Sequence, residues 1–447
     1  MNQPLHVMYL FPGQGSQYVG MGSDLYREHA VVRDVYERAS DTLGFDVAAL
    51  SFRGPQDRLD TTEYTQVALL THSIACLEAL RSLSEGRWSA GICAGHSLGE
   101  YSALVAAEAL SFEDALRLVR ERGRLMSIYG RGKMAAFKLD LESIKPIADN
   151  FYCGIGGCNM PDQTVVCGHQ EDLDALMGHI VETFGRAKAG RYLNTNGAFH
   201  TYLMTEAAEH YRAVLDSAVF KPPRIKTLAN YTGDYHRDNP ATVKAWLFFQ
   251  LFHPVKWLAG MRRAIADGAN LIVELGGGIG KDNQGEPSPM SRKPNLEGIT
   301  RKSQRSFGND GLYMAVINSD SLRNTLGRLA VLETIGQATP DDAWQSRRAV
   351  DGRWFRLYVP TRDGVPTEAA LDIAARLHET GLEHIVPTIP ESPDENLNNL
   401  RQFLDPDISA PEPYLEIIVG GGFVTVLHYR GNQIAEELTQ IRGRLTA

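Results

Sequence analysis

The stretch from Ser89 to Leu110, SAGICAGHSLGEYSALVAAEAL, constrains the fold of this chain more than any other. The apolar run AGICAG predicts a buried strand, and the alanine-rich run after the turn predicts a helix. Ser97 lies between them in G-H-S-L-G, where glycines permit a tight backbone turn. A strand, a tight turn and a helix in this order are typical of a nucleophile elbow. The alternative is a glycine-lined turn whose serine caps the helix.

Strands and helices alternate around this turn. The run HVMYLF predicts a strand that ends at the turn PGQGSQ, and helical spacing of apolar residues follows over 24–43 and 66–83. The run LIVELGGG around Glu274 predicts the strand that returns the chain to the same sheet. This order predicts an α/β fold whose large domain has a mostly parallel, hydrolase-like sheet covered by helices.

The order of elements changes from Lys133 onward. Strand, helix, strand, strand, helix and strand follow one another up to about residue 195, which is the ferredoxin-like order. We therefore expect a ferredoxin-like subdomain at 133–197, inserted into a large domain made of 1–132 and 198–305.

The last third of the chain predicts a further folded region. Residues 280–310 are polar and rich in Gly, Pro and Ser, which indicates a loop or linker. Beyond it, strands such as YLEIIVGG and helices such as EAALDIAARLHETG predict a smaller C-terminal α/β region at 312–447. A chain of 447 residues is too long for one ordinary core, which agrees with several domains.

Composition excludes several classes of protein. The formal net charge is -9, from 45 basic and 54 acidic side chains, so we expect no nucleic-acid partner. Five cysteines without regular spacing favour reduced thiols over a disulfide framework, and no metal-type pairing of Cys and His occurs. The N-terminal apolar run is too short for a signal peptide, and no stretch predicts a membrane span. We therefore expect a cytoplasmic location.

Six motifs, in order along the first two thirds of the chain, resemble those of malonyl-CoA:acyl carrier protein transacylases and polyketide synthase acyltransferase domains. They are FPGQGSQ at Phe11–Gln17, TQVALL at Thr65–Leu70, GHSLGEYSALV at Gly95–Val105, RERGRLM at Arg120–Met126, CNMPDQTVVCG at Cys158–Gly168 and GAFHTYLM at Gly197–Met204. Several motifs in order are far more specific than any one of them. The family also carries a ferredoxin-like insertion.

The resemblance implies roles for the serine and its partners. Ser97 is the expected nucleophile, and a serine needs a base to be reactive. The family's base is His200, which is oriented by backbone carbonyl groups; a buried structural histidine is the alternative. His96 is expected to point away from the site as a packed or capping residue. The oxyanion donors are expected to be the backbone N–H groups of Gln14 and Leu98.

Three further residues are expected to bind substrate. Arg122 occupies the family's carboxylate-binding position, which implies a dicarboxylic acyl group such as malonyl; a solvated helix face is the alternative. Gln66 is expected to line the pocket, although a helix-surface glutamine fits the pattern too. Phe199 favours malonyl over larger acyl groups, with core packing as a compatible role. Gly197, before it, is expected to open space beside the phenylalanine ring.

The resemblance implies transfer of a malonyl-type group from coenzyme A, through an ester on Ser97, to the phosphopantetheine thiol of an acyl carrier protein. Coenzyme A enters as part of the substrate, and no metal or other cofactor is expected. Two alternatives stay open: an acyl hydrolase of the same fold, and a docking protein with a vestigial acyltransferase part. The run ELGGGIGKDNQGEP departs from the family's usual E-x-G-P-G, which puts the support of His200 in doubt.

Overall fold

The computed structural model describes residues 5–195, 197–280 and 292–337, together with short strands of the C-terminal region. Contacts divide the chain into two compact units, one covering Leu5–Ser319 and the other containing the residues from Asp320 onward. Among the described residues, no helix combines the length and the apolar character needed to cross a membrane.

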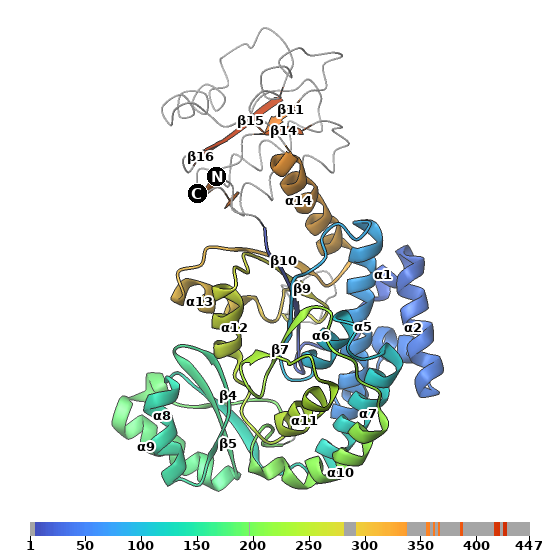
Figure 1. The fold of residues 1–447 in the computed structure, drawn as a ribbon. Coiled ribbons are helices and arrows are strands. Elements are labelled where there is room, and N and C mark those ends of the chain that lie inside the picture. Colours follow the sequence, from blue (N-terminus) through green and yellow to red (C-terminus); the bar gives the residue numbers. More distant parts are fainter. Residues whose placement is uncertain are drawn as a thin grey trace. The chain divides into compact units, whose positions relative to one another are not determined.

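The first unit is built on a twisted sheet of six described strands in the order β10-β9-β1-β2-β7-β8 (Figure 1). All neighbouring pairs are parallel except β7 and β8, which are antiparallel. The strands are β1 (Val7–Phe11), β2 (Ile92–Gly95), β7 (Lys226–Ala229), β8 (Asp234–Tyr235), β9 (Leu271–Leu275) and β10 (Leu312–Val316). Phe11 pairs with Gly95, so the turns that follow β1 and β2 lie side by side.

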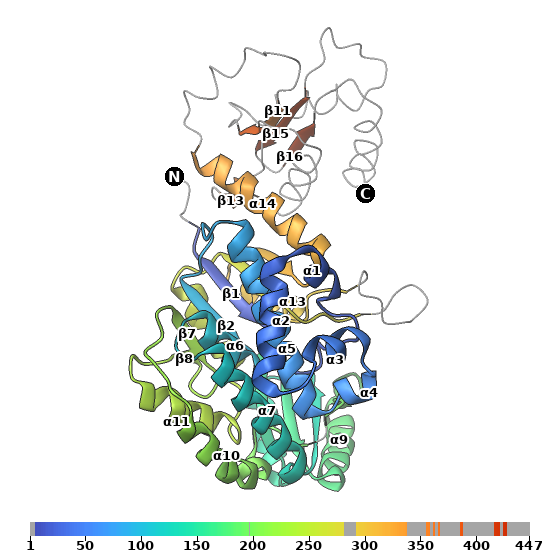
Figure 2. The same ribbon diagram turned by 90° about the vertical axis from the view of Figure 1, so that its right-hand side faces the viewer.

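Helices cover this sheet, as the alternating pattern predicts. In Figure 2, α2, α5 and α7 pack together, while α12 and α13 lie on the opposite side of the sheet in Figure 1. The helices are α1 (Ser23–Glu28), α2 (Ala30–Leu43), α3 (Val47–Arg53), α4 (Gln56–Leu59), α5 (Thr62–Leu83), α6 (Gly99–Ala106), α7 (Phe112–Tyr129), α10 (Thr205–Ser217), α11 (Pro240–Gln250), α12 (Trp257–Ala266) and α13 (Glu297–Ser306).

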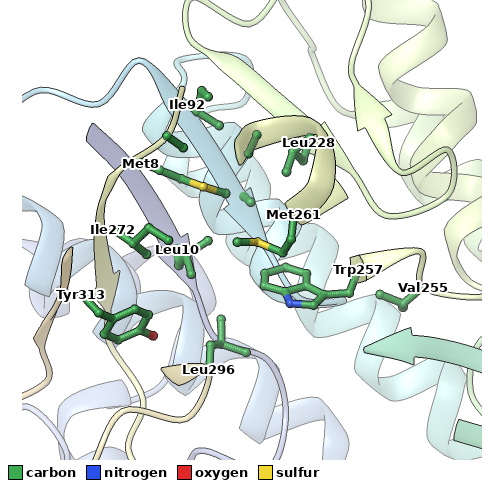
Figure 3. Close-up of a cluster of buried hydrophobic side chains, with 13 residues drawn as sticks. Met8, Leu10, Ile92, Leu228, Val255, Trp257, Met261, Ile272, Leu296 and Tyr313 are labelled. Atoms are coloured by element: carbon green, nitrogen blue, oxygen red, sulfur yellow. The ribbon is translucent and has the colours of Figure 1, made fainter. Parts of the chain in front are cut away.

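A hydrophobic core fixes α12 against the strands (Figure 3). Met8, Leu10 and Ile272 project from the central strands, and Trp257 and Met261 project from the helix to meet them. Both faces of β1, β2 and β9 are buried, which explains their continuous apolar runs. Burial of these side chains is the main free energy that holds the carboxyl ends of β1 and β2 in place.

A second sheet of four antiparallel strands lies in the insertion, in the order β4-β5-β3-β6. Its elements are β3 (Lys133–Phe137), α8 (Leu141–Asn150), β4 (Gly154–Met160), β5 (Gln163–Gly168), α9 (Gln170–Phe184) and β6 (Arg191–Tyr192), which is the order predicted from the sequence. Val255 connects this sheet to the large domain through two hydrogen bonds with β4. Its N–H donates to Gly156 O, and its oxygen accepts from the Cys158 N–H, each at 3.0 Å.

The large domain extends further than the expected end at residue 305. Strand β10 pairs with β9 as the edge of the main sheet, with Leu312 opposite Leu271. The sequence placed residue 312 at the start of the C-terminal region because the polar stretch before it resembled a linker. That stretch contains the helix α13, whose Thr300 and Ser303 are buried against the domain.

The second unit contains α14 (Ser319–Gln337) at its start and a four-stranded sheet in the order β14-β11-β15-β16. Its described strands are β11 (Phe355–Leu357), β12 (Thr361–Arg362), β13 (Val365–Pro366), β14 (Ile385–Pro387), β15 (Leu415–Gly420) and β16 (Phe423–Val426). Strand β15 falls in the run YLEIIVGG, which was predicted as a strand. The helices predicted after residue 365 lie outside the described residues.

Candidate active site

Ser97 lies at the apex of the turn between β2 and α6. Its φ of 52° is the left-handed conformation, which non-glycine residues rarely adopt. A Cβ on Gly95 would lie 1.9 Å from the Gly99 carbonyl group, and one on Gly99 would lie 2.1 Å from the oxygen of Phe11. Both glycines are therefore required for the sharp turn that presents the serine at the carboxyl edge of the sheet.

His200 contacts the serine directly. Its Nε2 atom lies 2.7 Å from Ser97 Oγ, and its Nδ1 atom lies 2.7 Å from the backbone oxygen of Gln250. A carbonyl oxygen only accepts, so the ring hydrogen is on Nδ1 and the Nε2 lone pair faces the serine hydroxyl. The His200 N–H also donates to Leu251 O at 3.1 Å. The support of His200 thus comes from Gln250 and Leu251, at the end of α11.

Burial, and after it the positive charge of Arg122, lower the pKa of His200 to about 3. The imidazole is therefore neutral throughout the physiological pH range. A neutral imidazole with its lone pair on a serine hydroxyl is the form that can accept the hydroxyl proton.

Arg122 projects from α7 to the same oxygen. Its side chain is buried, and Nη2 donates to Ser97 Oγ at 3.1 Å. Nη1 donates to Gln66 Oε1 at 3.0 Å, and Nη2 also donates to Gln250 Oε1 at 3.0 Å. Within the described part of the chain, no carboxylate lies within 4.0 Å of this guanidinium, and Nε has no hydrogen-bond partner. A buried cation beside the serine is thus left without a counter-ion, which favours an anionic ligand there.

Gln66 and Phe199 lie in the buried interior. Gln66 belongs to α5, is fully buried, and its Nε2 lies 3.6 Å from Met126 Sδ, so it is not a helix-surface residue. Phe199 is 6% exposed and packs with Met126 and Met204. The expectation that Gly197 opens space is wrong, because a Cβ there would lie 2.9 Å from the Phe199 ring and 3.0 Å from Met204 Cε. The phenylalanine ring fills that space itself.

The two expected oxyanion donors lie on adjacent turns. Leu98 precedes α6, and Gln14 follows β1, whose last residue pairs with the end of β2. In the described ranges, no hydrogen-bond acceptor is seen for either backbone N–H. A Cβ on Gly13 would lie 2.6 Å from the His96 oxygen, so the Gln14 turn packs closely against the serine turn. The N–H groups of Gln14 and Leu98 therefore have no acceptor among the described residues, which leaves them available to bind an oxyanion.

The ring of His96 has its hydrogen-bond partner in the inserted subdomain. Its Nε2 lies 2.9 Å from Asn159 Oδ1 on β4, and its ring centroid is 5.3 Å from that of Trp257. Burial lowers the pKa of His96. These contacts tie the serine turn to the inserted subdomain.

Asn230 and Gln250 also hold the serine turn, and neither was predicted from the sequence. Asn230 Oδ1 accepts from the Ser97 N–H at 2.7 Å, and its Nδ2 donates to Gly95 O at 2.7 Å. Gln250 Nε2 donates to Ser97 O at 2.9 Å. One signal was present for Asn230, because it directly follows β7 at the carboxyl edge of the sheet, where ligands of α/β proteins bind.

Comparison with known proteins decides the family. Residues 8–276 match the family model described as the acyl transferase domain, and this span contains every residue of the site described above. The chain belongs to the acyl transferase family. The resemblance that the sequence motifs indicated is thereby confirmed.

Relatives of this acyl transferase agree with the family and the fold. Over 281 residues it is 37% identical to the malonyl CoA-acyl carrier protein transacylase of Bacillus subtilis (strain 168), covering 61% of this chain and 87% of the relative. It is 34% identical to the polyketide biosynthesis transacylase PksC of the same strain over 277 residues, covering 61% and 93%. The crystal structure of the Clostridium perfringens transacylase superposes with a TM-score of 0.66 and 28% identity, covering 74% and 100%. The predicted fold class is confirmed.

Proposed function

We propose that this acyl transferase moves a malonyl group from coenzyme A onto Ser97 and then onto the phosphopantetheine thiol of an acyl carrier protein. The observation that carries the proposal is the buried guanidinium of Arg122, which touches Ser97 Oγ and has no carboxylate partner within the described part of the chain. The names of the relatives, which state malonyl-CoA and acyl carrier protein, support the same substrates.

The first half-reaction loads the serine. His200 Nε2 accepts the hydroxyl proton while Ser97 Oγ attacks the thioester carbon, and the other ring hydrogen stays on Nδ1, donated to the Gln250 oxygen. The carbonyl oxygen becomes an oxyanion, for which we assign the N–H groups of Leu98 and Gln14 as donors. Collapse of the tetrahedral intermediate breaks the carbon–sulfur bond. The leaving thiolate takes the proton from His200, so coenzyme A departs as the thiol and the acyl ester remains.

The second half-reaction unloads the serine by the same path in reverse. The phosphopantetheine thiol gives its proton to His200 and attacks the ester carbon. Ser97 Oγ then leaves and recovers the proton, which completes ping-pong transfer with the free enzyme restored. Because atoms and protons balance with these groups alone, we propose that the reaction needs no metal or other cofactor.

The charge of Arg122 sets the class of acyl group. A guanidinium can hold a carboxylate through two parallel hydrogen bonds, and Gln66 and Gln250 already hold Arg122 from two sides. A malonyl carboxylate supplies the missing counter-ion, whereas an acetyl group leaves the buried charge unpaired. This preference argues against a hydrolase for simple monoacyl groups. Phe199, packed behind the site, is proposed to limit the size of the acyl group.

We also propose a cytoplasmic location. All five cysteines are free, and four of them are buried. Burial raises the pKa values of Cys76, Cys93 and Cys167, so these thiols are protonated and unreactive at neutral pH. Free thiols throughout a chain are typical of a reducing compartment.

A transfer assay separates the transferase from the hydrolase. The full chain is mixed with malonyl-CoA and a phosphopantetheinylated carrier protein, and the carrier is followed by intact mass together with the release of free malonate. We expect malonyl-carrier to form far faster than free malonate, and Ser97→Ala to abolish both. Free malonate as the main product would instead support the hydrolase.

A further inference from the structure

Glu100, in the first turn of α6, holds a buried carboxylate one turn below the nucleophile. Its Oε1 atom lies 2.8 Å from His236 Nε2. Its Oε2 atom accepts from the Asn230 N–H at 3.0 Å and from Gln250 Nε2 at 2.8 Å. A carboxylate only accepts hydrogen bonds, so all three neighbours must present donors to it. Neither Glu100 nor His236 contacts Ser97 Oγ.

The contact with Glu100 fixes which way the Gln250 amide faces. Its NH₂ group must face Glu100 and the Ser97 oxygen, which leaves Oε1 to accept from Arg122 Nη2. If the amide turned over, its NH₂ would oppose the guanidinium and its oxygen would oppose the carboxylate. The main-chain oxygen of the same glutamine accepts from His200 Nδ1. Gln250 therefore connects Glu100 to the nucleophile, the base and the carboxylate-binding arginine.

Asn230 carries a second connection to the serine turn. Glu100 holds its main-chain N–H, while its side chain bonds Ser97 N and Gly95 O. Ser97 has the strained φ of 52°, and such a conformation persists only where its surroundings over-determine it. Asn230 accepts from the main-chain N–H of Ser97, and Gln250 donates to its main-chain oxygen, so both main-chain polar groups of Ser97 are held.

His236 completes the network. Its side chain and that of Glu100 are both fully buried, and the His236 ring lies 5.4 Å from the Trp246 ring. The Nδ1 atom of His236 has no hydrogen-bond partner among the described residues, so a hydrogen there would be buried and unpaired. The ring hydrogen is therefore on Nε2, where it is donated to Glu100.

We propose that Glu100 and His236 are positioning residues, which set the nucleophile turn, the base and Arg122 through Asn230 and Gln250. The proposal rests on the function proposed above. A displacement of about 1 Å at a reacting group costs on the order of 10²-fold in rate. Loss of the network is expected to slow acylation of Ser97 and also to weaken the preference for malonyl over acetyl, because the partner of Arg122 is no longer fixed.

The test measures single-turnover acylation of Ser97 by malonyl-CoA and by acetyl-CoA, corrected for the folded fraction. Glu100→Ala is expected to lower the malonyl rate about 10²-fold and to reduce the malonyl-to-acetyl ratio. Glu100→Gln keeps one acceptor oxygen, so it should retain most of the malonyl rate and most of the malonyl-to-acetyl ratio. His236→Phe keeps the ring volume and removes the donor, so we expect a loss of about tenfold. If Glu100→Ala fails to fold, the other two variants are measured in the same way.

The matched control is Glu274→Gln. Glu274 is another fully buried carboxylate, which accepts from the N–H groups of Asn295 and Leu296; none of the hydrogen bonds described for it involves a residue of the serine network. It should change thermal stability but leave the acylation rate and the acyl preference per folded molecule unchanged. Wild-type rate and preference in Glu100→Ala, or in His236→Phe where Glu100→Ala does not fold, would overturn the proposal.

A fluorophosphonate probe separates this proposal from the proposed function. Its covalent reaction with Ser97 reports nucleophile activation without any acyl substrate. Wild-type protein that reacts with the probe but not with malonyl-CoA would contradict the proposed function. The variants would then still test the positioning role, because slower reaction with the probe is expected of Glu100→Ala and of His236→Phe, and an unchanged rate in both would overturn it.

Discussion

The guanidinium of Arg122 and the imidazole of His200 meet on one atom, Ser97 Oγ, at 3.1 Å and 2.7 Å. One group supplies a fixed positive charge, and the other supplies a lone pair for the hydroxyl proton. The charge of Arg122 also lowers the pKa of His200, after the larger effect of burial. Substrate recognition and base strength are therefore coupled through two residues that share the nucleophile.

Arg122→Ala should reduce malonyl transfer far more than acetyl transfer. A hydrogen bond to a charged group contributes about 1.5–3 kcal/mol, which corresponds to a loss on the order of 10- to 10²-fold in kcat/KM for malonyl-CoA. Arg124→Ala is the matched control, because Arg124 lies on the same helix but is partly exposed and paired with Glu121 at 2.8 Å. Equal losses for both acyl groups would show that Arg122 acts only in folding.

The pH dependence of Ser97 acylation should lack the usual histidine inflection. The pKa of His200 is lowered to about 3, so the base is already neutral at pH 5 and the rate should stay flat from there to pH 8. In Arg122→Ala the nearby positive charge is gone, so the pKa of His200 should rise and the inflection should move toward neutral pH. Single-turnover rates measured across this range provide the check, and a wild-type inflection near 6.5 would contradict the account.

The same shift has a consequence for stability. The folded pKa of His200 lies below the unfolded value of about 6.5, so the unfolded chain binds more protons between the two. The contribution of His200 to stability is therefore present above pH 6.5 and is lost as the pH falls toward 3. His200→Gln should flatten the pH dependence of the free energy of unfolding over this interval. Urea titrations at several pH values measure the free energy of unfolding. If it changed with pH equally in the wild type and in His200→Gln, the lowered pKa of His200 would be refuted.

Gly197→Ala should disturb the acyl pocket. The new methyl group would lie 2.9 Å from Phe199 and 3.0 Å from Met204, so the ring or the methionine must move, at a cost of about 1–3 kcal/mol. Gly178→Ala in α9 is the control, because its Cβ meets nothing within 4 Å and alanine favours the helix. Gly197→Ala should lower the melting temperature and change KM for malonyl-CoA, whereas Gly178→Ala should leave KM unchanged and should not lower the melting temperature. A pocket variant that behaves like the control would show that Phe199 is not held there.

A chain that ends at Ser319 should fold and form the acyl-enzyme, whereas one that ends at Asn309 should be much less stable. The shorter chain lacks β10, whose buried Leu312, Met314 and Val316 form the edge of the main sheet beside β9. All residues of the proposed site precede Ser319. Solubility, circular dichroism and acylation of both chains test this. A folded chain ending at Ser319 that cannot be acylated would place part of the site in the C-terminal unit.

The sequence predicted the parts of the site that have a local signature. Ser97 stands in a glycine turn between a strand and a helix, and Arg122 and His200 lie in motifs that resemble those of a known family. Gln250 has no such signature, because it holds His200 through a main-chain oxygen that any residue could supply. Glu100 and His236 are 136 positions apart, so only the fold reveals that they touch.

The fold was predictable for a similar reason. Strands β1, β2 and β9 are buried on both faces and are therefore visible as apolar runs. The polar sequence of α13 concealed a helix whose few buried residues are Thr300, Ser303 and Gln304, which carry no apolar periodicity. The predicted large domain therefore ended too early, and β10 was assigned to the C-terminal region instead.

The intact mass of the protein after brief mixing with malonyl-CoA tests the central claim most directly, followed by peptide mapping of the adduct. The account predicts a single added malonyl group on the peptide that contains Ser97, its removal by a phosphopantetheine thiol, and no adduct on Ser97→Ala. An unmodified wild-type protein, or a full-strength adduct on Ser97→Ala, would contradict it.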